Sequence, residues 1–260
     1  MNDAVISAAV TRWQLDAQTG TAATDFVSAE TAIALVFNGI SHAVMMATPR
    51  DLVALALGFA LSEGIIDRRA DWRATEVMPA TAAGIEVQME ISPRCFERLK
   101  TKRRTLAGAT GCGLCGMESL DALAFKGEPI LDKKWQGSLN ATTILKAIAA
   151  LPPSQPNNAI TGSLHAAAWA TPDGRLTAVL EDVGRHNALD KLIGTISLPQ
   201  RGFAVMSSRA SVELVRKCVQ LKIPALATIS APTSLAIAFA QQNNLQLWGM
   251  CRPPTAVRYN

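Results

Sequence analysis

The sequence predicts an α/β protein in two parts, an α+β N-terminal domain and a three-layer α/β/α C-terminal domain. In the first half, segments that alternate apolar and polar residues accompany one helix that is apolar nearly all round. From about residue 160 onward, strand-like and helix-like segments alternate, which is typical of a three-layer domain with parallel strands. A stretch at 127–140 that resembles a linker separates the parts, so we place the domains at 1–134 and 135–260.

The first half is expected to contain a hairpin and a further strand. Residues 32–37 and 40–46 predict two strands joined at Asn38-Gly39, a dipeptide typical of tight hairpin turns. Residues 85–91 alternate between apolar and charged or amide side chains, which predicts a half-buried strand. These segments would form one small sheet.

A buried helix is expected directly after the hairpin. Thr48 followed by Pro49 favours a helix start, with Thr48 as the N-cap and Pro49 at the first helical position. Residues 52–61 are apolar on nearly all sides, so this helix should be buried within the protein.

The second half should begin with a capped helix and a loop before the alternating segments. Asn140 or Thr142 is suited to cap a helix whose apolar side chains share one face. Residues 152–158 are expected to form a loop. We then predict strands at 165–170, 175–180, 202–206, 225–229 and 245–249, with helices at 185–196, at 209–221 and after Ser230.

The composition limits the class of protein. Hydrophobic residues make up 49% of the chain and charged residues 18%, so a globular protein is expected rather than a disordered one. No apolar run approaches the roughly 20 residues that a membrane-spanning helix needs. The first 25 residues lack the apolar core of a secretory signal. We therefore expect a cytoplasmic protein, with neither a membrane nor a nucleic acid among its partners.

Positive charge is concentrated in one short stretch, residues 94–104. This stretch holds six basic residues against Glu97 alone, whereas the remainder of the chain carries 19 basic and 20 acidic residues. Such a stretch can be a solvated face or an anion-binding segment. The cysteine pair that follows it favours the second interpretation.

Cys112 and Cys115 form a Cys-x-x-Cys pair that is flanked by glycines. A zinc site normally takes four ligands, so zinc would have to recruit distant residues such as Cys95 or His165. A thioredoxin-like redox pair needs a preceding strand and a long following helix. The basic residues upstream favour the nucleophilic thiolate, and the glycines give the segment backbone freedom. The pair therefore suits a carrier that must visit two partners.

Polar residues cluster in four segments beside the predicted strands, at 161–165, 181–187, 207–209 and 230–234. Ligands of α/β sheets bind at the carboxyl ends of strands, next to helix N-termini. Hydroxyls and helix-end amides would hold phosphate, and Arg185 and Arg209 would pair with it. Glu181 or Asp182 could accept hydrogen bonds from a ribose or a base.

Each of these residues also has a structural interpretation. Ser208 and Ser230 could simply cap helices, and the two carboxylates could pair with Arg185. The predicted cofactor-binding residues are Gly162, His165, Glu181, Asp182, Gly184, Arg185, His186, Asn187, Ser207, Ser208, Arg209, Ser230, Ala231, Pro232 and Thr233.

Four sequence blocks make the chain resemble a known family. The blocks are TGCGLCG at 110–116, EDVGRHNALDK at 181–191, SSRASVE at 207–213 and SAPTS at 230–234. In these blocks, and in segments 38–52 and 62–66, the chain is similar to the FdhD family of formate dehydrogenase accessory sulfurtransferases. The resemblance extends over about residues 28–253. At Ser163 and Ser208 the family often has glycine.

The resemblance implies a function, a fold and a set of partners. FdhD proteins take a persulfide sulfur from a cysteine desulfurase and pass it to the molybdenum bis(molybdopterin guanine dinucleotide) cofactor of formate dehydrogenase. The implied fold has a C-terminal domain like cytidine deaminase, and the implied assembly is a homodimer. Cys112 and Cys115 match the sulfur-bearing pair, and we expect Cys112 to hold the persulfide. The cofactor would be a bound substrate, and no tightly bound metal of the protein's own is expected.

Two other functions stay open from the residues alone. The chain could be a chaperone that binds the molybdenum cofactor without transferring sulfur, or a zinc-binding nucleotide protein. Full function with an already sulfurated cofactor would indicate the chaperone, and about one zinc per chain would indicate the zinc protein.

Overall fold

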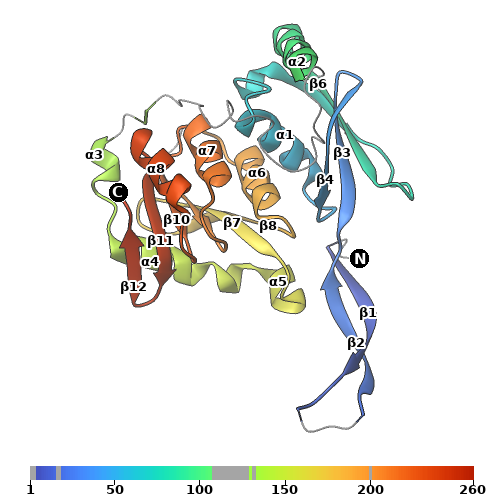
Figure 1. Ribbon diagram of the computed structural model, residues 1–260, viewed down its shortest axis with the longest axis vertical. Coiled ribbons are helices and arrows are strands. Elements are labelled where there is room, and N and C mark those ends of the chain that lie inside the picture. Colours follow the sequence, from blue (N-terminus) through green and yellow to red (C-terminus); the bar gives the residue numbers. More distant parts are fainter. Residues whose placement is uncertain (1–3, 16–18, 107–128, 131–132, 199–200) are drawn as a thin grey trace.

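The computed structural model describes residues 4–15, 19–106, 129–130, 133–198 and 201–260 (Figure 1). It contains helices and three sheets, which confirms the predicted α/β class. The smallest sheet is a two-stranded arm of β1 (Val5–Arg12) and β2 (Thr21–Ser28). Figure 1 shows that this arm projects away from the rest of the molecule.

The hairpin, the strand and the buried helix predicted for the first half are confirmed. The four-stranded sheet has the order β4-β3-β6-β5. Its strands are β3 (Thr31–Phe37), β4 (Ile40–Ala47), β5 (Trp72–Val77) and β6 (Ile85–Ile91). Asn38 and Gly39, between β3 and β4, both have positive φ, as a tight Asn-Gly turn requires. Helix α1 (Leu52–Ser62) is buried along most of its length.

The predicted start of α1 is wrong. The helix begins at Leu52, with Asp51 at the N-cap position. Thr48 does not cap it, because its hydroxyl oxygen accepts a hydrogen bond from the backbone N–H of Val183 at 3.2 Å. Thr48 therefore joins the first half of the chain to the second.

The basic stretch is helical and partly neutralised. It lies in α2 (Pro93–Leu106), beyond the 3-10 helix η1 (Arg69–Asp71). The guanidinium groups of Arg94 and Arg98 lie 2.7 and 2.9 Å from the carboxylate of Asp67. The hydrogen bond from Arg98 is the largest contribution that lowers the pKa of Asp67. These two arginines thus belong to an ion-pair cluster of the fold.

The second large sheet has six strands in the order β12-β11-β10-β9-β7-β8. The strands are β7 (His165–Ala170), β8 (Leu176–Asp182), β9 (Phe203–Met206), β10 (Ala225–Thr228), β11 (Gln246–Arg252) and β12 (Thr255–Arg258). Strands β9, β10 and β11 pair in parallel, as predicted, and the prediction of parallel strands is wrong for β7. Strand β7 is antiparallel to both of its neighbours, and β12 is antiparallel to β11. Short connections rather than helical crossovers join β7 to β8 and β11 to β12, and short connections produce antiparallel pairs.

Helices cover both faces of this sheet, as the three-layer prediction requires. The helices of this half are α3 (Lys133–Gln136), α4 (Ala141–Ala150), η3 (Pro152–Ser154), α5 (Pro156–Thr161), α6 (Arg185–Thr195), α7 (Val212–Gln220) and α8 (Ser234–Gln242). The side-chain oxygen of Asn140 accepts from the N–H of Thr143 at 3.0 Å, so the predicted cap of α4 is confirmed. The predicted loop at 152–158 is wrong, because proline at the first position favours the short helices η3 and α5.

Helix α1 crosses α6 at very close range. A Cβ atom at Gly58 would overlap the backbone oxygen of Asp190, and one at Gly194 would overlap the backbone oxygen of Ala54. Only glycine permits such an approach of two backbones. One continuous apolar core therefore contains residues of both large sheets. The division into domains near residue 134 stays a prediction.

We predict that Gly58→Ala destabilises the protein. The added methyl group must push α1 away from α6, and such overpacking costs about 1–3 kcal/mol, against a gain in helix propensity of up to about 1 kcal/mol. The free energy of unfolding in urea measures the effect. Val53→Ala on the exposed face of the same helix is the matched control, with a change within about 0.5 kcal/mol. Equal stability of the two variants would contradict the close crossing.

Candidate functional site

The four polar segments meet at one edge of the six-stranded sheet. His165 at the start of β7 lies opposite Asp182 at the end of β8. Met206 ends β9 and pairs with both Ala167 of β7 and Thr228 at the end of β10. The structure therefore brings the predicted binding residues together at this edge. Cys112 and Cys115 lie outside the described residues.

Asp182 anchors the loop between β8 and α6. Its buried carboxylate accepts hydrogen bonds from the backbone N–H of Gly184 at 2.8 Å and from the side-chain amide of Asn187 at 3.0 Å. It also accepts from the backbone N–H of Thr48 at 3.1 Å and lies 2.6 Å from the ammonium of Lys191. Because both oxygens are engaged with protein donors, this carboxylate positions the loop rather than facing an open space.

Glu181 has a comparable role on the other side of β8. Its carboxylate accepts from the backbone N–H groups of Asn157 and Asn158 at 3.1 and 2.8 Å, and from the side-chain amide of Asn157 at 2.7 Å. These are the first backbone N–H groups of α5, which have no hydrogen-bond partner within the helix, so Glu181 provides their acceptor. Gly162 ends α5 in the left-handed region, with φ of 66°. Both carboxylates therefore have a structural role, as the alternative interpretation expected. Their partners are other backbone and side-chain groups rather than Arg185.

His165, Arg185 and Arg209 form a cationic corner at the sheet edge. Burial lowers the pKa of His165, and the charges of Arg185 and Arg209 lower it further. Burial and then Arg209 also lower the pKa of Arg185. Within the described part of the chain, neither guanidinium lies within 4.0 Å of a carboxylate. Two guanidinium groups that lie close together repel each other, and an anion bound between them would relieve this repulsion.

Of the two serines that follow β9, Ser207 lies beside this cationic corner. The Ser207 hydroxyl oxygen accepts from the N–H of Ala166 at 2.8 Å and lies 3.5 Å from Nδ1 of His165. The Ser208 hydroxyl is buried and donates to the backbone oxygen of Arg209 at 3.0 Å. Its hydroxyl therefore does not face open solvent.

Neither of the serines suggested as helix caps is at a cap position. Helices α7 and α8 begin later than predicted, with Ser211 and Thr233 at their N-cap positions. The Thr233 side chain accepts from the N–H of Ala236 at 3.3 Å. Ser230, Ala231 and Pro232 form the connection from β10 to that cap.

His186 is a neutral histidine at the start of α6. Burial, followed by the charges of Arg185 and Lys217, lowers its pKa to about 4. Its Nε2 atom is buried and lies 4.0 Å from a carboxylate oxygen of Glu213. An ordinary histidine has a pKa of about 6.5, so at neutral pH His186 carries no charge.

We predict that His186 makes the protein less stable in mild acid. Between pH 6.5 and about 4, the unfolded chain binds a proton at this position more readily than the folded chain does. The free energy of unfolding should therefore fall as the pH falls through that window. His186→Gln should flatten this part of the stability profile. An NMR titration of the His186 ring near pH 6.5 in the folded protein would contradict the prediction.

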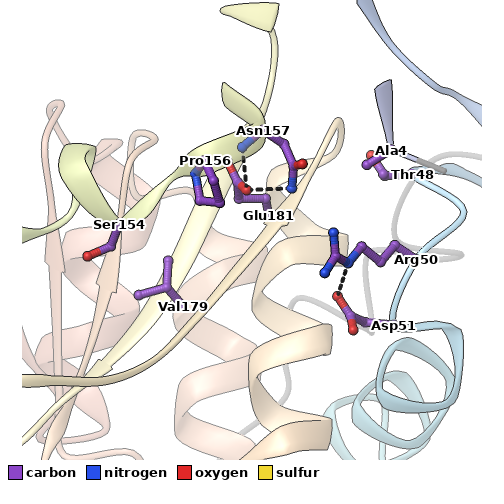
Figure 2. A pocket seen from close by; sticks show the side chains of 9 residues that line it. All are labelled: Ala4, Thr48, Arg50, Asp51, Ser154, Pro156, Asn157, Val179 and Glu181. Atoms are coloured by element: carbon purple, nitrogen blue, oxygen red, sulfur yellow. Dashed lines mark hydrogen bonds and ion pairs between the residues drawn. The ribbon is translucent and has the colours of Figure 1, made fainter. Parts of the chain in front are cut away.

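The sequence interpretation missed a cavity of about 180 Å³ beside Glu181 (Figure 2). Four separate stretches of the chain line it. The lining residues are Ala4, Thr48, Arg50, Asp51, Ser154, Pro156, Asn157, Val179 and Glu181. The available signal was the charged pair Arg50-Asp51 between a predicted strand and an apolar helix.

One group of the described residues has the spacing of metal ligands. Ligand atoms of Asp67, Asp71 and Cys95 all lie within 4.8 Å of one another. Arg94 lies 2.7 Å from the Asp67 carboxylate and 3.4 Å from that of Asp71, and Arg98 also pairs with Asp67. These cations already compensate the carboxylates, so the cluster is built as ion pairs. Among the described helices, none has the length and apolar character needed to cross a membrane.

Comparison with known proteins identifies the family. The model of the FdhD/NarQ family matches residues 28–260. A relative named sulfur carrier protein FdhD, from Chromobacterium violaceum, is 53% identical over 239 residues, which cover 90% of this chain and 88% of the relative. The chain belongs to the FdhD/NarQ family. A second relative of the same name, from Burkholderia mallei, is 48% identical over 98% of this chain and 95% of its own length.

A solved structure shares the fold of this FdhD/NarQ chain. It is described as a formate dehydrogenase accessory protein from Desulfotalea psychrophila. The two structures superpose with a TM-score of 0.72 and cover 98% of this chain and 96% of the other, at 22% sequence identity. The resemblance to the FdhD family predicted from the four sequence blocks is confirmed by the family match and by the relatives about half identical.

Proposed function

We propose that this chain takes a persulfide sulfur from a cysteine desulfurase on Cys112 and passes it to the molybdenum bis(molybdopterin guanine dinucleotide) cofactor of formate dehydrogenase. The observation that carries the proposal is membership of the FdhD/NarQ family, with relatives about half identical that are named sulfur carrier proteins. The Cys112–Cys115 pair gives this chain the thiols that a sulfur carrier needs. We place these reactions in the cytoplasm.

The cationic corner supports the cofactor as the bound substrate. The cofactor carries several phosphates, and guanidinium groups are suited to pair with phosphate in a bidentate way. Arg185 and Arg209 would hold phosphate oxygens, and the Ser207 hydroxyl beside His165 could donate to one of them. His165 would act as a neutral donor or acceptor, because burial and the two arginines keep its pKa low.

Sulfur loading is a thiol exchange. The Cys112 thiolate attacks the outer sulfur of the desulfurase persulfide, a new S–S bond forms on Cys112, and the desulfurase cysteine leaves as a thiolate. For delivery, the Cys115 thiolate attacks the inner sulfur of the Cys112 persulfide. This step forms a Cys112–Cys115 disulfide and releases hydrosulfide to the metal centre. A thiol reductant of the cell must then reduce the disulfide before the next cycle.

Mass spectrometry of the loaded protein tests the proposal. After incubation with a cysteine desulfurase and cysteine, we expect the mass of one additional sulfur atom on the peptide that contains Cys112. Treatment with a reducing thiol should remove it. A protein that gains no sulfur on either Cys112 or Cys115, while the desulfurase is active, would contradict the proposal.

A cofactor chaperone without sulfur transfer is the second candidate. The cationic corner favours it, because Arg185 and Arg209 can bind an anionic cofactor without any cysteine. The two functions differ in one result: a chaperone would restore formate dehydrogenase equally well when both Cys112 and Cys115 are alanine.

We also propose that the chain acts as a homodimer. Five of the exposed large hydrophobic side chains lie on or beside the β1–β2 arm: Ile6, Trp13, Leu15, Phe26 and Val27. A two-stranded hairpin is only marginally stable by itself in water, so a second copy that covers the arm would stabilise it. Light scattering during size-exclusion chromatography measures the mass, and a monomer at micromolar concentration would contradict the dimer.

A further inference from the structure

Lys191 of α6 carries a buried ammonium group that has no part in the functions described so far. Its side chain is 0% exposed, as is that of Asp182, whose carboxylate lies 2.6 Å away. The ammonium also donates to the backbone oxygens of Thr48 at 3.1 Å and Glu181 at 3.4 Å. An ammonium has three donor hydrogens, so these three acceptors use its full capacity.

The Lys191–Asp182 pair is not explained by stability alone. Taking two charges out of water is costly, and well-packed apolar residues often stabilise a fold as well as a buried ion pair does. The carboxylate already accepts hydrogen bonds from three neutral groups, on Thr48, Gly184 and Asn187. What Lys191 adds to these donors is a positive charge.

Arg185 is a nearby cation that lacks such a partner. Its Nε atom is buried and has no hydrogen-bond partner among the described residues, and its guanidinium forms no ion pair with them. Arg185 occupies the first position of α6, where the helix dipole disfavours a cation. Burial and the charge of Arg209 outweigh the attraction of Glu213 and lower the pKa of Arg185. A free carboxylate close to this arginine would therefore be a favourable partner for it.

Asp182 is a carboxylate beside the cationic corner. It ends β8 and lies opposite His165 of β7. Burial, Arg185 and Arg209 lower the pKa of His165, and the charge of Asp182 opposes them. Without a counter-charge of its own, Asp182 would attract Arg185 and repel an approaching anion.

We propose that Lys191 is a positioning residue for the anion site: its ammonium neutralises Asp182, so that the positive charge of Arg185 stays available for a phosphate group. Lys191 touches no ligand and acts through Asp182. The inference deepens the proposed function, and it rests on that function for the assignment of phosphate to the cationic corner. The ligand class is a diphosphate or a similar polyanion.

Lys191→Gln tests this role, because it removes the charge and keeps a hydrogen-bond donor. The three neutral donors should keep Asp182 ionised, so its negative charge would act on the corner. We expect inorganic pyrophosphate to bind about ten-fold more weakly in calorimetry at low salt, as one uncompensated charge implies. In an NMR titration, His165 should become protonated at a higher pH than in the parent protein, because Asp182 favours the protonated ring.

A second substitution separates electrostatics from packing. Asp182→Asn combined with Lys191→Gln leaves the pair without net charge, as in the parent protein. The double variant should recover most of the pyrophosphate affinity, and the His165 titration should return toward that of the parent. A role confined to packing predicts the opposite, because the double variant loses more of the native contacts than the single variant does.

The matched control is Lys217→Met. Lys217 is a second buried lysine that pairs with an aspartate, Asp190, and it is not among the charges that act on His165. Its substitution should lower stability and leave both the pyrophosphate affinity and the His165 titration unchanged. Thermal unfolding reports which variants are folded.

Asp182→Asn alone replaces Lys191→Gln if the latter does not fold. It removes the negative charge, so pyrophosphate should bind at least as tightly as to the parent protein. Weaker binding to folded Asp182→Asn would overturn the inference. Unchanged affinity and an unchanged His165 titration in folded Lys191→Gln would overturn it too, as would a double variant that binds no better than Lys191→Gln or a parent protein that binds no pyrophosphate.

Persulfide loading distinguishes this inference from the proposed function. Lys191→Gln should still accept sulfur on Cys112, because Lys191 has no part in that exchange. Sulfur loading together with a pyrophosphate affinity that does not depend on Lys191 would overturn this inference alone. The expected dependence on Lys191 in a protein that takes up no sulfur would overturn the sulfur-carrier proposal alone.

Discussion

Cys112→Ala should abolish formate dehydrogenase activity in cells that depend on this chain. The substitution removes the thiolate that is proposed to carry the sulfur, and the buried thiols elsewhere cannot replace it. Cys95, Cys218 and Cys251 are all buried. Burial raises the pKa of Cys218 to about 12 and that of Cys251 to about 11, so at neutral pH these two are thiols with little nucleophilic thiolate.

Formate oxidation in extracts of a strain that lacks the chromosomal copy measures the effect. Immunoblots should show equal amounts of the variant and the parent protein. Cys218→Ala is the matched control, because it removes a cysteine from the buried face of α7 and should retain activity. Cys115→Ala should load sulfur normally and slow its delivery. Undiminished activity with Cys112→Ala would contradict a persulfide on this residue.

Lys217→Ala should cost about 3–5 kcal/mol of stability, because it leaves a buried carboxylate without its partner. The ammonium of Lys217 lies 3.0 Å from the Asp190 carboxylate, 2.7 Å from that of Glu63 and 2.8 Å from the Ser62 hydroxyl. Burial raises the pKa of Asp190, and the two carboxylates outweigh burial to raise the pKa of Lys217. These residues join the end of α1 to α6 and α7.

Urea denaturation measures this loss. Lys146→Ala is the control, because the Lys146–Asp173 pair is exposed and such pairs contribute about 0–1 kcal/mol. A double variant with Lys217→Met and Asp190→Leu should recover much of the stability, since apolar groups of similar volume avoid burying an unpaired charge. A loss below about 1 kcal/mol for Lys217→Ala would contradict the buried ion-pair network.

The sequence predicted those elements whose signals are local. The Asn38-Gly39 turn, the alternation in β6 and the Asn140 cap each depend on residues within a few positions of one another, and all are present in the structure. The clustering of polar loops at one sheet edge was also predictable, because strand ends define that edge.

Features that depend on distant segments were not predictable in this way. Thr48 has the local signature of a cap, but its partner Asp182 lies 134 positions further along the chain. The same contact brings the Arg50-Asp51 wall beside Glu181 and so creates the cavity. The parallel sheet prediction failed at β7, because alternation of elements does not reveal strand direction. The Cys112–Cys115 prediction lies outside the described residues.

The glycine crossing of α1 and α6 has a consequence for ligand binding. Helix α1 starts directly after Arg50 and Asp51, and α6 starts directly after the loop that Asp182 holds. Because the two helices touch backbone to backbone at Gly58 and Gly194, the segments that lead into them are fixed to a common block. The cavity should therefore exist before any ligand arrives, and a preformed site loses less conformational entropy on binding. We expect the backbone amides on both sides of the crossing to exchange slowly with solvent, at one shared rate.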